Sequence, residues 1–146
     1  MSLSKAMDIL SSGMHAQRVR LDVTSSNLAN ANTTRTKEGG AYRRMDPVVS
    51  ATPIGDGEGG FGESEFDAAL RRVDVVGIQA DSSPLPQIHD PGHPDADPVT
   101  GMVTLPNVNV VEEMVNMITA ARSYEANVTA FETLKQMAVK AMDIGK

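Results

Sequence analysis

Every proline in the chain lies between Pro47 and Pro106, and ten of the twelve glycines lie between Gly39 and Gly101. Proline and glycine disrupt helices, so both ends of the chain are free to form long helices and the middle is not. The 146-residue chain is therefore expected to be mainly α with a small β insert. Long N- and C-terminal helices should form a coiled-coil layer, with a minor β-rich domain between them in the sequence.

This distribution divides the chain into three predicted segments. Residues 1–34 hold an N-terminal helix and an Asn-rich motif, residues 35–105 form a β-rich, Pro/Gly-rich middle domain, and residues 106–146 form a C-terminal helix. Within the middle, the runs 41–52 and 71–81 are rich in Val and Tyr and are bounded by turn residues, as is typical of strands. The Gly-rich acidic stretch between these runs is expected to be a loop.

The first helix is predicted from Leu3 to Leu28, with Ser2 or Ser4 as its N-cap. Small residues at positions 6, 13 and 16 should let a neighbouring helix approach closely. Beside them, steps of three and four residues trace a heptad line that contains Leu3, Met7, Leu10, Met14, Gln17, Leu21, Thr24 and Leu28.

The last helix is predicted over residues 108–143, and its apolar stripe is wider. Val111, Val115, Ile118 and Leu134 extend the stripe beyond a two-helix seam, so this helix should contact more than one partner. An exposed apolar surface of that extent usually marks an interface. The heptad line of this helix contains Val110, Met114, Met117, Ala121, Tyr124, Val128, Phe131, Lys135, Ala138 and Met142.

Tyr124 lies in the middle of that line and supplies the largest apolar area of its layer. A buried tyrosine hydroxyl usually finds a hydrogen-bond partner. The sequence predicts that both the partner and most of the burial of this ring come from a neighbouring chain.

Charge and composition restrict the possible partners. Residues 1–45 carry a net charge of +4, whereas residues 46–100 carry −9. An acidic middle argues against nucleic acid, because phosphate binding needs clustered Lys and Arg. No apolar run reaches the roughly 18 residues of a membrane span, and the N-terminus lacks the pattern of a cleaved signal peptide. The chain also has no cysteine.

No pattern in the chain predicts catalysis or cofactor binding. His89, Asp90, His93, Asp95 and Asp97 lie close together in sequence, but the glycine of a calcium loop is missing and Pro91 prevents a helix that would align the histidines. We expect a proline-stiffened turn there and no metal site. The glycine-rich run at 55–62 lacks the Lys-Ser/Thr of a phosphate-binding loop, and common hydrolase motifs are absent.

Two stretches carry a resemblance to a known family. "SSNLANANTTRTKEGGAYRR" resembles the N-terminal signature of the flagellar rod and hook axial proteins, in which Asn-Leu-Ala-Asn-x-Asn-Thr closes a helix. "IHDPGHPDAD" and the segment from "LPNVNVVEEM" to the C-terminus resemble the proximal-rod branch of that family. The resemblance covers both helical ends and the Pro-rich loop, about two-thirds of the chain.

The resemblance implies a non-enzymatic structural subunit of the flagellar basal-body rod, which polymerises through its terminal helices into the drive shaft between motor and hook. The implied partners are other rod proteins and copies of itself in a helical tube, junction proteins of the MS ring and export gate, and the flagellar type III export apparatus. The implied location is the periplasmic part of the basal body, reached without a cleaved signal peptide.

The Asn-rich motif then has a predicted role where subunits crowd together. Leu28 continues the helical line. Asn27, Asn30 and Asn32 are expected to satisfy backbone groups at the helix end, with Asn32 in the left-handed conformation of a C-cap. A plain helix stop without any contact between subunits is the alternative. The residues predicted to form the assembly interface are Leu3, Met7, Leu10, Met14, Leu21, Asn27, Leu28, Asn30, Asn32, Met114, Met117, Ala121, Tyr124, Val128, Phe131 and Met142.

A soluble coiled-coil adaptor or export chaperone of a type III secretion system is the alternative function. Such a chaperone needs neither the β insert nor the Pro-rich loop, so the middle segment argues against it. The two classes should differ in the isolated chain, because a chaperone is stably helical alone whereas a rod subunit should have poorly ordered ends.

Overall fold

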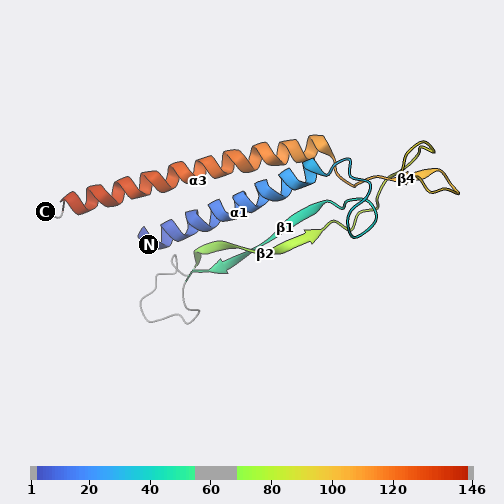
Figure 1. The fold of residues 1–146 in the computed structure, drawn as a ribbon. Coiled ribbons are helices and arrows are strands. Elements are labelled where there is room, and N and C mark those ends of the chain that lie inside the picture. Colours follow the sequence, from blue (N-terminus) through green and yellow to red (C-terminus); the bar gives the residue numbers. More distant parts are fainter. Residues whose placement is uncertain (1–2, 55–68, 145–146) are drawn as a thin grey trace. The chain divides into compact units, whose positions relative to one another are not determined.

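A computed structural model of the chain describes residues 3–54 and 69–144. Its elements follow the order α1 (Leu3–Ala29), β1 (Met45–Pro53), β2 (Arg71–Ala80), β3 (Gln87–His89), β4 (Met102–Thr104) and α3 (Val110–Ile144) (Figure 1). The expected class, mainly α with a small β insert, is confirmed by two long helices with short strands between them in sequence. The predicted loop at 55–65 lies outside the described residues.

The observed helix ends lie within one or two residues of the predicted ends, and one of the two predicted N-caps of α1 is wrong. Ser4 lies inside α1, so it is not the N-cap, and Ser2 lies outside the described residues. The helix α3 begins at Val110 because Asn109 caps it: the Asn109 Oδ1 accepts a 3.1 Å hydrogen bond from the amide of Val111. A side-chain oxygen in this position satisfies an amide that has no partner inside the helix.

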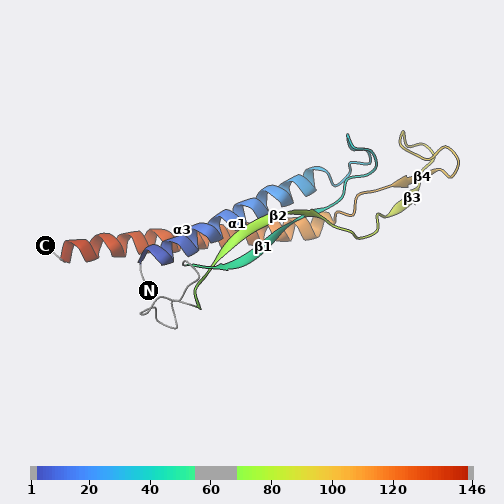
Figure 2. The ribbon, with the colours of Figure 1, turned by 90° about the horizontal axis from the view of Figure 1, so that it is seen from below.

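Both predicted strand runs form strands, and they pair with each other. The strands β1 and β2 make a two-stranded sheet whose arrows run in opposite directions (Figure 1). The Pro-rich segment adds a second small sheet, in which β3 and β4 pair antiparallel with Gln87 opposite Thr104 and His89 opposite Met102 (Figure 2). Short strands separated by proline turns agree with the expectation that prolines exclude helix from this segment.

The chain forms two compact units, and both helices contribute to each of them. The first contains Met1–Val19, Val48–Gly77 and Thr119–Lys146, and the second contains Arg20–Pro47 and Ile78–Ile118. The division into three segments stays a prediction. Neither described helix has the length and hydropathy that a membrane span requires.

Each unit has a small core. In the first unit the buried residues are alanines, and Gly13 lies so close to α3 that an added Cβ would stand 3.1 Å from the Asn127 amide nitrogen. This close approach of the helices confirms the reading of the small residues at positions 6, 13 and 16. In the second unit the buried residues are Val23, Thr24, Asn27, Pro47, Val103, Pro106 and Glu113. A core that contains an asparagine and a glutamate needs hydrogen bonds for both, because an unpaired buried polar group is costly.

Candidate functional site

Asn27, in the last turn of α1, makes four hydrogen bonds with its side chain and is 1% exposed. Its Oδ1 accepts from the Tyr42 hydroxyl and from the Met45 amide, both at 2.9 Å. Its Nδ2 donates to the Met45 carbonyl at 2.8 Å and to Oε2 of Glu113 at 3.0 Å. A side-chain amide has two donor hydrogens and two acceptor lone pairs, so this one is fully used.

The contact between Asn27 and Met45 fixes the start of the sheet to the end of α1. The side-chain amide binds both the N–H and the C=O of Met45, as a neighbouring strand would do. The first residue of β1 therefore needs no further strand to satisfy its backbone groups. Asn27 thus joins the helix to the strand from within the same chain.

Glu113, in the first turn of α3, is also 1% exposed, and both of its carboxylate oxygens have partners. Besides Asn27 on Oε2, the Arg44 guanidinium donates to Oε1 at 2.7 Å. A carboxylate in the first helical turn is further favoured by the positive end of the helix dipole. These groups satisfy a buried charge that would otherwise be very unfavourable.

Arg44 extends the network to the segment before α3. The hydrogen bond with Glu113, together with the negative charges of that residue and Asp46, raises the pKa of Arg44 above its ordinary value, although burial opposes this shift. The guanidinium also lies 3.9 Å from Asp81, and the Arg44 backbone amide donates to Oδ1 of Asn107 at 2.8 Å. We call Asn27, Tyr42, Arg44, Met45 and Glu113 the Asn27 cluster.

The end of α1 is closed by Asn30, as predicted, but without a left-handed residue. Asn30 Nδ2 donates to the Ser26 carbonyl at 2.9 Å, and its Oδ1 accepts from the Thr33 hydroxyl at 3.2 Å. The prediction for Asn32 is wrong, because no described residue other than glycine has a positive φ. The helix tightens instead: the amides of residues 31 and 33 each bond the carbonyl three residues earlier, and such turns need no left-handed cap.

The buried line of α1 is displaced from the predicted heptad line by one residue. The residues Ala6, Gly13, Ala16, Val23 and Asn27 face inward, and each precedes a member of the predicted line. Thr24 is the one buried residue of α1 that belongs to the predicted line itself. One residue corresponds to a rotation of about 100° around the helix axis. Small and polar residues thus make the contact within the chain, while the larger Met and Leu side chains lie half-buried at its edge.

The helix α3 shows the same displacement. Its buried residues over the first turns are Glu113 and Ala120, each one position before Met114 and Ala121 of the predicted line, whereas Asn116 and Met117 are both half-buried. Four large apolar side chains face outward instead, with exposed fractions between 49% and 70%. We call these the outward patch: Val111, Met114, Val115 and Ile118.

The outward patch is confined to the first turns of α3. Residues at heptad spacing after Ile118, such as Glu125 and Glu132, lie on the same line of the helix but are charged and exposed. The charged positions separate the outward patch from further exposed apolar residues near the end of the helix, namely Met137, Val139 and Met142. This contrast provides matched positions for a test of function.

The structure distributes the sixteen predicted interface residues among three environments. Asn27 is buried within its own chain. Half-buried positions are Met7, Leu10, Met14, Leu21, Leu28, Asn30, Met117, Ala121, Val128 and Phe131. Exposed positions are Leu3, Asn32, Met114, Tyr124 and Met142. Tyr124 is 36% exposed, and the expectation that most of its burial comes from a neighbouring chain stays a prediction. Membership of an interface between chains stays a prediction for all of them.

The cluster contains functional candidates that sequence reasoning missed, namely Tyr42, Arg44 and Glu113. Glu113 had a weak signal, since it is one of two adjacent carboxylates at the start of a helix with a wide apolar stripe. Tyr42 and Arg44 had none, because their partners lie up to 69 residues away in sequence.

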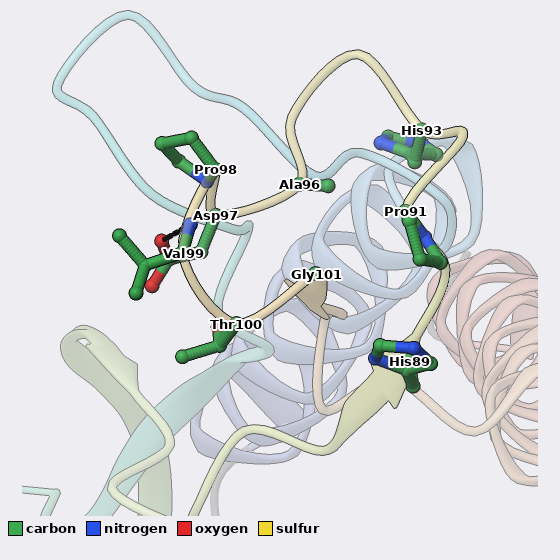
Figure 3. Close-up of a pocket in the computed structure, with 9 residues that line it drawn as sticks. All are labelled: His89, Pro91, His93, Ala96, Asp97, Pro98, Val99, Thr100 and Gly101. Atoms are coloured by element: carbon green, nitrogen blue, oxygen red, sulfur yellow. Dashed lines mark hydrogen bonds between the residues drawn. The ribbon is translucent and has the colours of Figure 1, made fainter.

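The Pro-rich loop between β3 and β4 surrounds a surface depression of about 350 Å³ (Figure 3). Its shape depends on an Asp turn, in which Asp97 Oδ1 accepts from the Val99 amide at 2.9 Å. Asp95 ties the loop to the segment after α1, accepting a 2.7 Å hydrogen bond from Thr34. Across the described residues, no three His, Asp or Glu side chains are placed to hold a metal ion. The lining residues are His89, Pro91, His93, Ala96, Asp97, Pro98, Val99, Thr100 and Gly101.

Comparison with known proteins gives matches along the whole chain. A family model described as flagella basal body rod protein matches residues 7–37, and one described as the C-terminal part of the flagellar basal body rod FlgEFG proteins matches residues 99–144. Proteins named flagellar basal-body rod protein FlgC are similar over their full length. That of Borreliella burgdorferi is 42% identical over 99% of this chain and 98% of its own. Those of Bacillus subtilis and Salmonella typhimurium are 40% and 38% identical over the whole of both chains.

Proposed function

The chain belongs to the FlgC family of flagellar basal-body rod proteins and is a structural, non-enzymatic subunit of the rod. From this premise we propose that it assembles through the outward patch of α3. Neighbouring rod subunits, including further copies of this chain, cover the patch with their own terminal helices. The similarity extends over entire rod proteins, which argues against the adaptor or chaperone alternative.

The observation that carries the proposal is the exposure of large apolar residues in the first turns of a helix that buries a carboxylate there. Val111 is 70% exposed and Ile118 is 56% exposed, whereas Glu113 between them is 1% exposed. Full burial of a Val, Ile or Met side chain contributes roughly 1.5–3 kcal/mol. Leaving four of them in water is unfavourable for an isolated chain and becomes favourable once a neighbour covers them.

A contact of this kind favours a filament over a closed oligomer. The outward patch on one subunit meets different surfaces of its neighbours, and a heterologous contact that does not close extends helically. In this proposal the helices form a coiled-coil layer of a tube in the periplasm and transmit torque from motor to hook. The first subunits contact the junction proteins of the MS ring and export gate.

The proposal includes export of the chain through the flagellar type III apparatus without a cleaved signal peptide. The core of each unit is small, and the described helices gain little burial from their own chain along the outward patch. Such a chain unfolds at low cost, which suits passage through a narrow channel. Helix content at the two ends of the chain then increases when neighbouring subunits cover them.

The test compares two serine variants on one line of α3. Ile118→Ser removes a central residue of the outward patch, and Glu125→Ser changes an exposed residue one heptad later. In cells that lack the native subunit, we expect Ile118→Ser to be exported normally and to be strongly depleted from purified basal bodies. Glu125→Ser should be incorporated at the native level.

Export and incorporation are measured separately, by the amount of subunit secreted and the amount in basal bodies. Equal incorporation of the Ile118→Ser and native chains would overturn the role of the outward patch. Loss of secretion without a change in incorporation per exported molecule would place the effect on export instead.

A further inference from the structure

In its first turns, α3 buries a charged residue and exposes large apolar residues. A helix in a soluble unit normally turns its apolar stripe toward the core. Here Glu113 and Asn116 face inward, and Met114 and Ile118 face outward. Hydrophobic burial alone would favour the alternative rotation, in which Met114 takes the buried position of Glu113.

The hydrogen bonds of the Asn27 cluster explain this rotation of α3. Glu113 reaches Asn27 with one carboxylate oxygen and Arg44 with the other, at 3.0 and 2.7 Å. Asn27 is held in place by its bonds to Tyr42 and Met45. Turning α3 by one residue, about 100°, would withdraw the carboxylate from both partners.

We propose that the contact of Glu113 with Asn27 and Arg44 is a positioning device that sets the rotation of α3 and thereby presents the outward patch. Glu113 acts through the helix and does not contact a neighbouring subunit itself. This inference rests on the proposed function only for the use of the patch, and the rotation can be measured in the isolated chain. Buried polar contacts are known to select register and orientation in helical assemblies.

The test uses the absence of cysteine from the chain, so that any introduced thiol is the only one. Met114→Cys reports on the outward face, where the native side chain is 49% exposed, and Asn116→Cys reports on the half-buried inward face. Each is labelled with a small maleimide in the full, unassembled chain. We expect the thiol at position 114 to react about tenfold faster, which corresponds to ~1.4 kcal/mol.

The decisive variant is Arg44→Met/Glu113→Met, which replaces the ion pair by apolar side chains of similar length. Asn27 keeps three of its four hydrogen bonds in this variant, and replacing a buried ion pair by apolar residues is often tolerated. We expect the ratio of the two labelling rates to fall to one or below, with helix content unchanged by circular dichroism. A ratio that stays near tenfold would overturn the proposal, as would equal rates in the chain that retains the ion pair.

Two further variants keep the test decisive. Glu113→Gln preserves size and can still accept from Arg44, but places a donor against the Asn27 amide nitrogen, so the ratio should fall about threefold. If the double variant does not fold, an unchanged ratio in Glu113→Gln overturns the proposal. Glu112→Met removes a carboxylate at the neighbouring exposed position and should leave the labelling ratio unchanged. A lower ratio in Glu112→Met would also overturn the proposal.

Basal-body incorporation separates this inference from the proposed function. A lost labelling ratio together with normal incorporation of Arg44→Met/Glu113→Met would support the positioning role and overturn the outward patch as the assembly surface. An unchanged labelling ratio in Arg44→Met/Glu113→Met, together with poor incorporation of Ile118→Ser, would overturn the positioning role and support the outward patch as the assembly surface.

Discussion

The side-chain amide of Asn27 donates a 3.0 Å hydrogen bond to the carboxylate of Glu113, 86 residues away in sequence, and both residues are 1% exposed. This contact joins the last turn of α1 to the first turn of α3 within one unit. Because the contact is polar and buried, it depends on geometry more strictly than an apolar contact does. It therefore specifies which faces of the two helices meet.

Replacement of Asn27 by alanine should destabilise the second unit strongly. The Asn27→Ala variant leaves the Tyr42 hydroxyl, both backbone groups of Met45 and one oxygen of Glu113 without their partner. We expect a loss of about 3–5 kcal/mol in the free energy of unfolding, measured by urea denaturation. Asn30→Ala is the control, since its exposed cap should cost only about 1 kcal/mol. Equal losses in the two variants would contradict the assigned role of Asn27.

Gly101 should be required for the Pro-rich loop. It has a φ of +66°, and an added Cβ would stand 2.8 Å from the His89 ring. Gly101→Ala should therefore lower the free energy of unfolding by about 1–2 kcal/mol from the left-handed backbone alone, and by more from the clash. Gly92→Ala is the matched control, because its Cβ would meet Asp90 at an ordinary 3.5 Å. Hydrogen exchange of the loop amides and thermal unfolding report the difference, and similar effects of the two changes would contradict the assignment.

The strands and helices could be predicted because local patterns determine them. Pro and Gly exclude helix from the middle, and Val-rich runs bounded by turn residues form β1 and β2. The small residues Ala6, Gly13 and Ala16 also indicated a close helix approach, which the contact of Gly13 with Asn127 confirms. Each of these signals is contained in a short window of sequence.

The rotation of the helices and the Asn27 cluster could not be predicted. Apolar periodicity selects the line through Met114, whereas the structure buries the line through Glu113. The hydrogen bonds that oppose apolar burial join residues that are 15 to 86 positions apart, so no short window of sequence contains them. Asn27 itself was singled out, but as a cap at the helix end and not as a partner of Met45 and Glu113.

The carboxyl of Asp81 should titrate at a low pH. The Ser83 hydroxyl at 2.6 Å and the Ser83 amide at 2.8 Å, together with the charges of Arg44 and Arg43, lower the pKa of Asp81. A lowered pKa in the folded state contributes stability above the unfolded-state pKa of about 3.9, and this stability is lost as pH falls through the folded-state value.

Ser83→Ala tests this assignment by removing the closer donor and keeping the amide. We expect it to raise the pKa of Asp81, measured from the carboxyl carbon shift by NMR, and to flatten the loss of stability below pH 4. The same pKa in both chains would show that the Ser83 hydroxyl does not stabilise the carboxylate. Asp81→Asn should flatten the acid dependence as well, because it removes the titrating group.

Tyr124 should contribute both to the folded chain and to assembly. Tyr124 is 36% exposed, so its own chain covers part of the residue and a neighbour can bury the rest. That part, roughly 80 Å², contributes about 2 kcal/mol at 25 cal/mol per Å². Tyr124→Ala should therefore lower the free energy of unfolding of the isolated chain and also reduce basal-body incorporation. Tyr124→Phe keeps the ring and should cost about 1 kcal/mol for one hydrogen bond.

The measurements that test the two roles of Tyr124 are urea denaturation of the isolated chains and incorporation at equal expression in cells that lack the native subunit. An alanine variant with native stability would contradict the burial within the chain, and one with reduced stability and native incorporation would place Tyr124 away from the subunit interface.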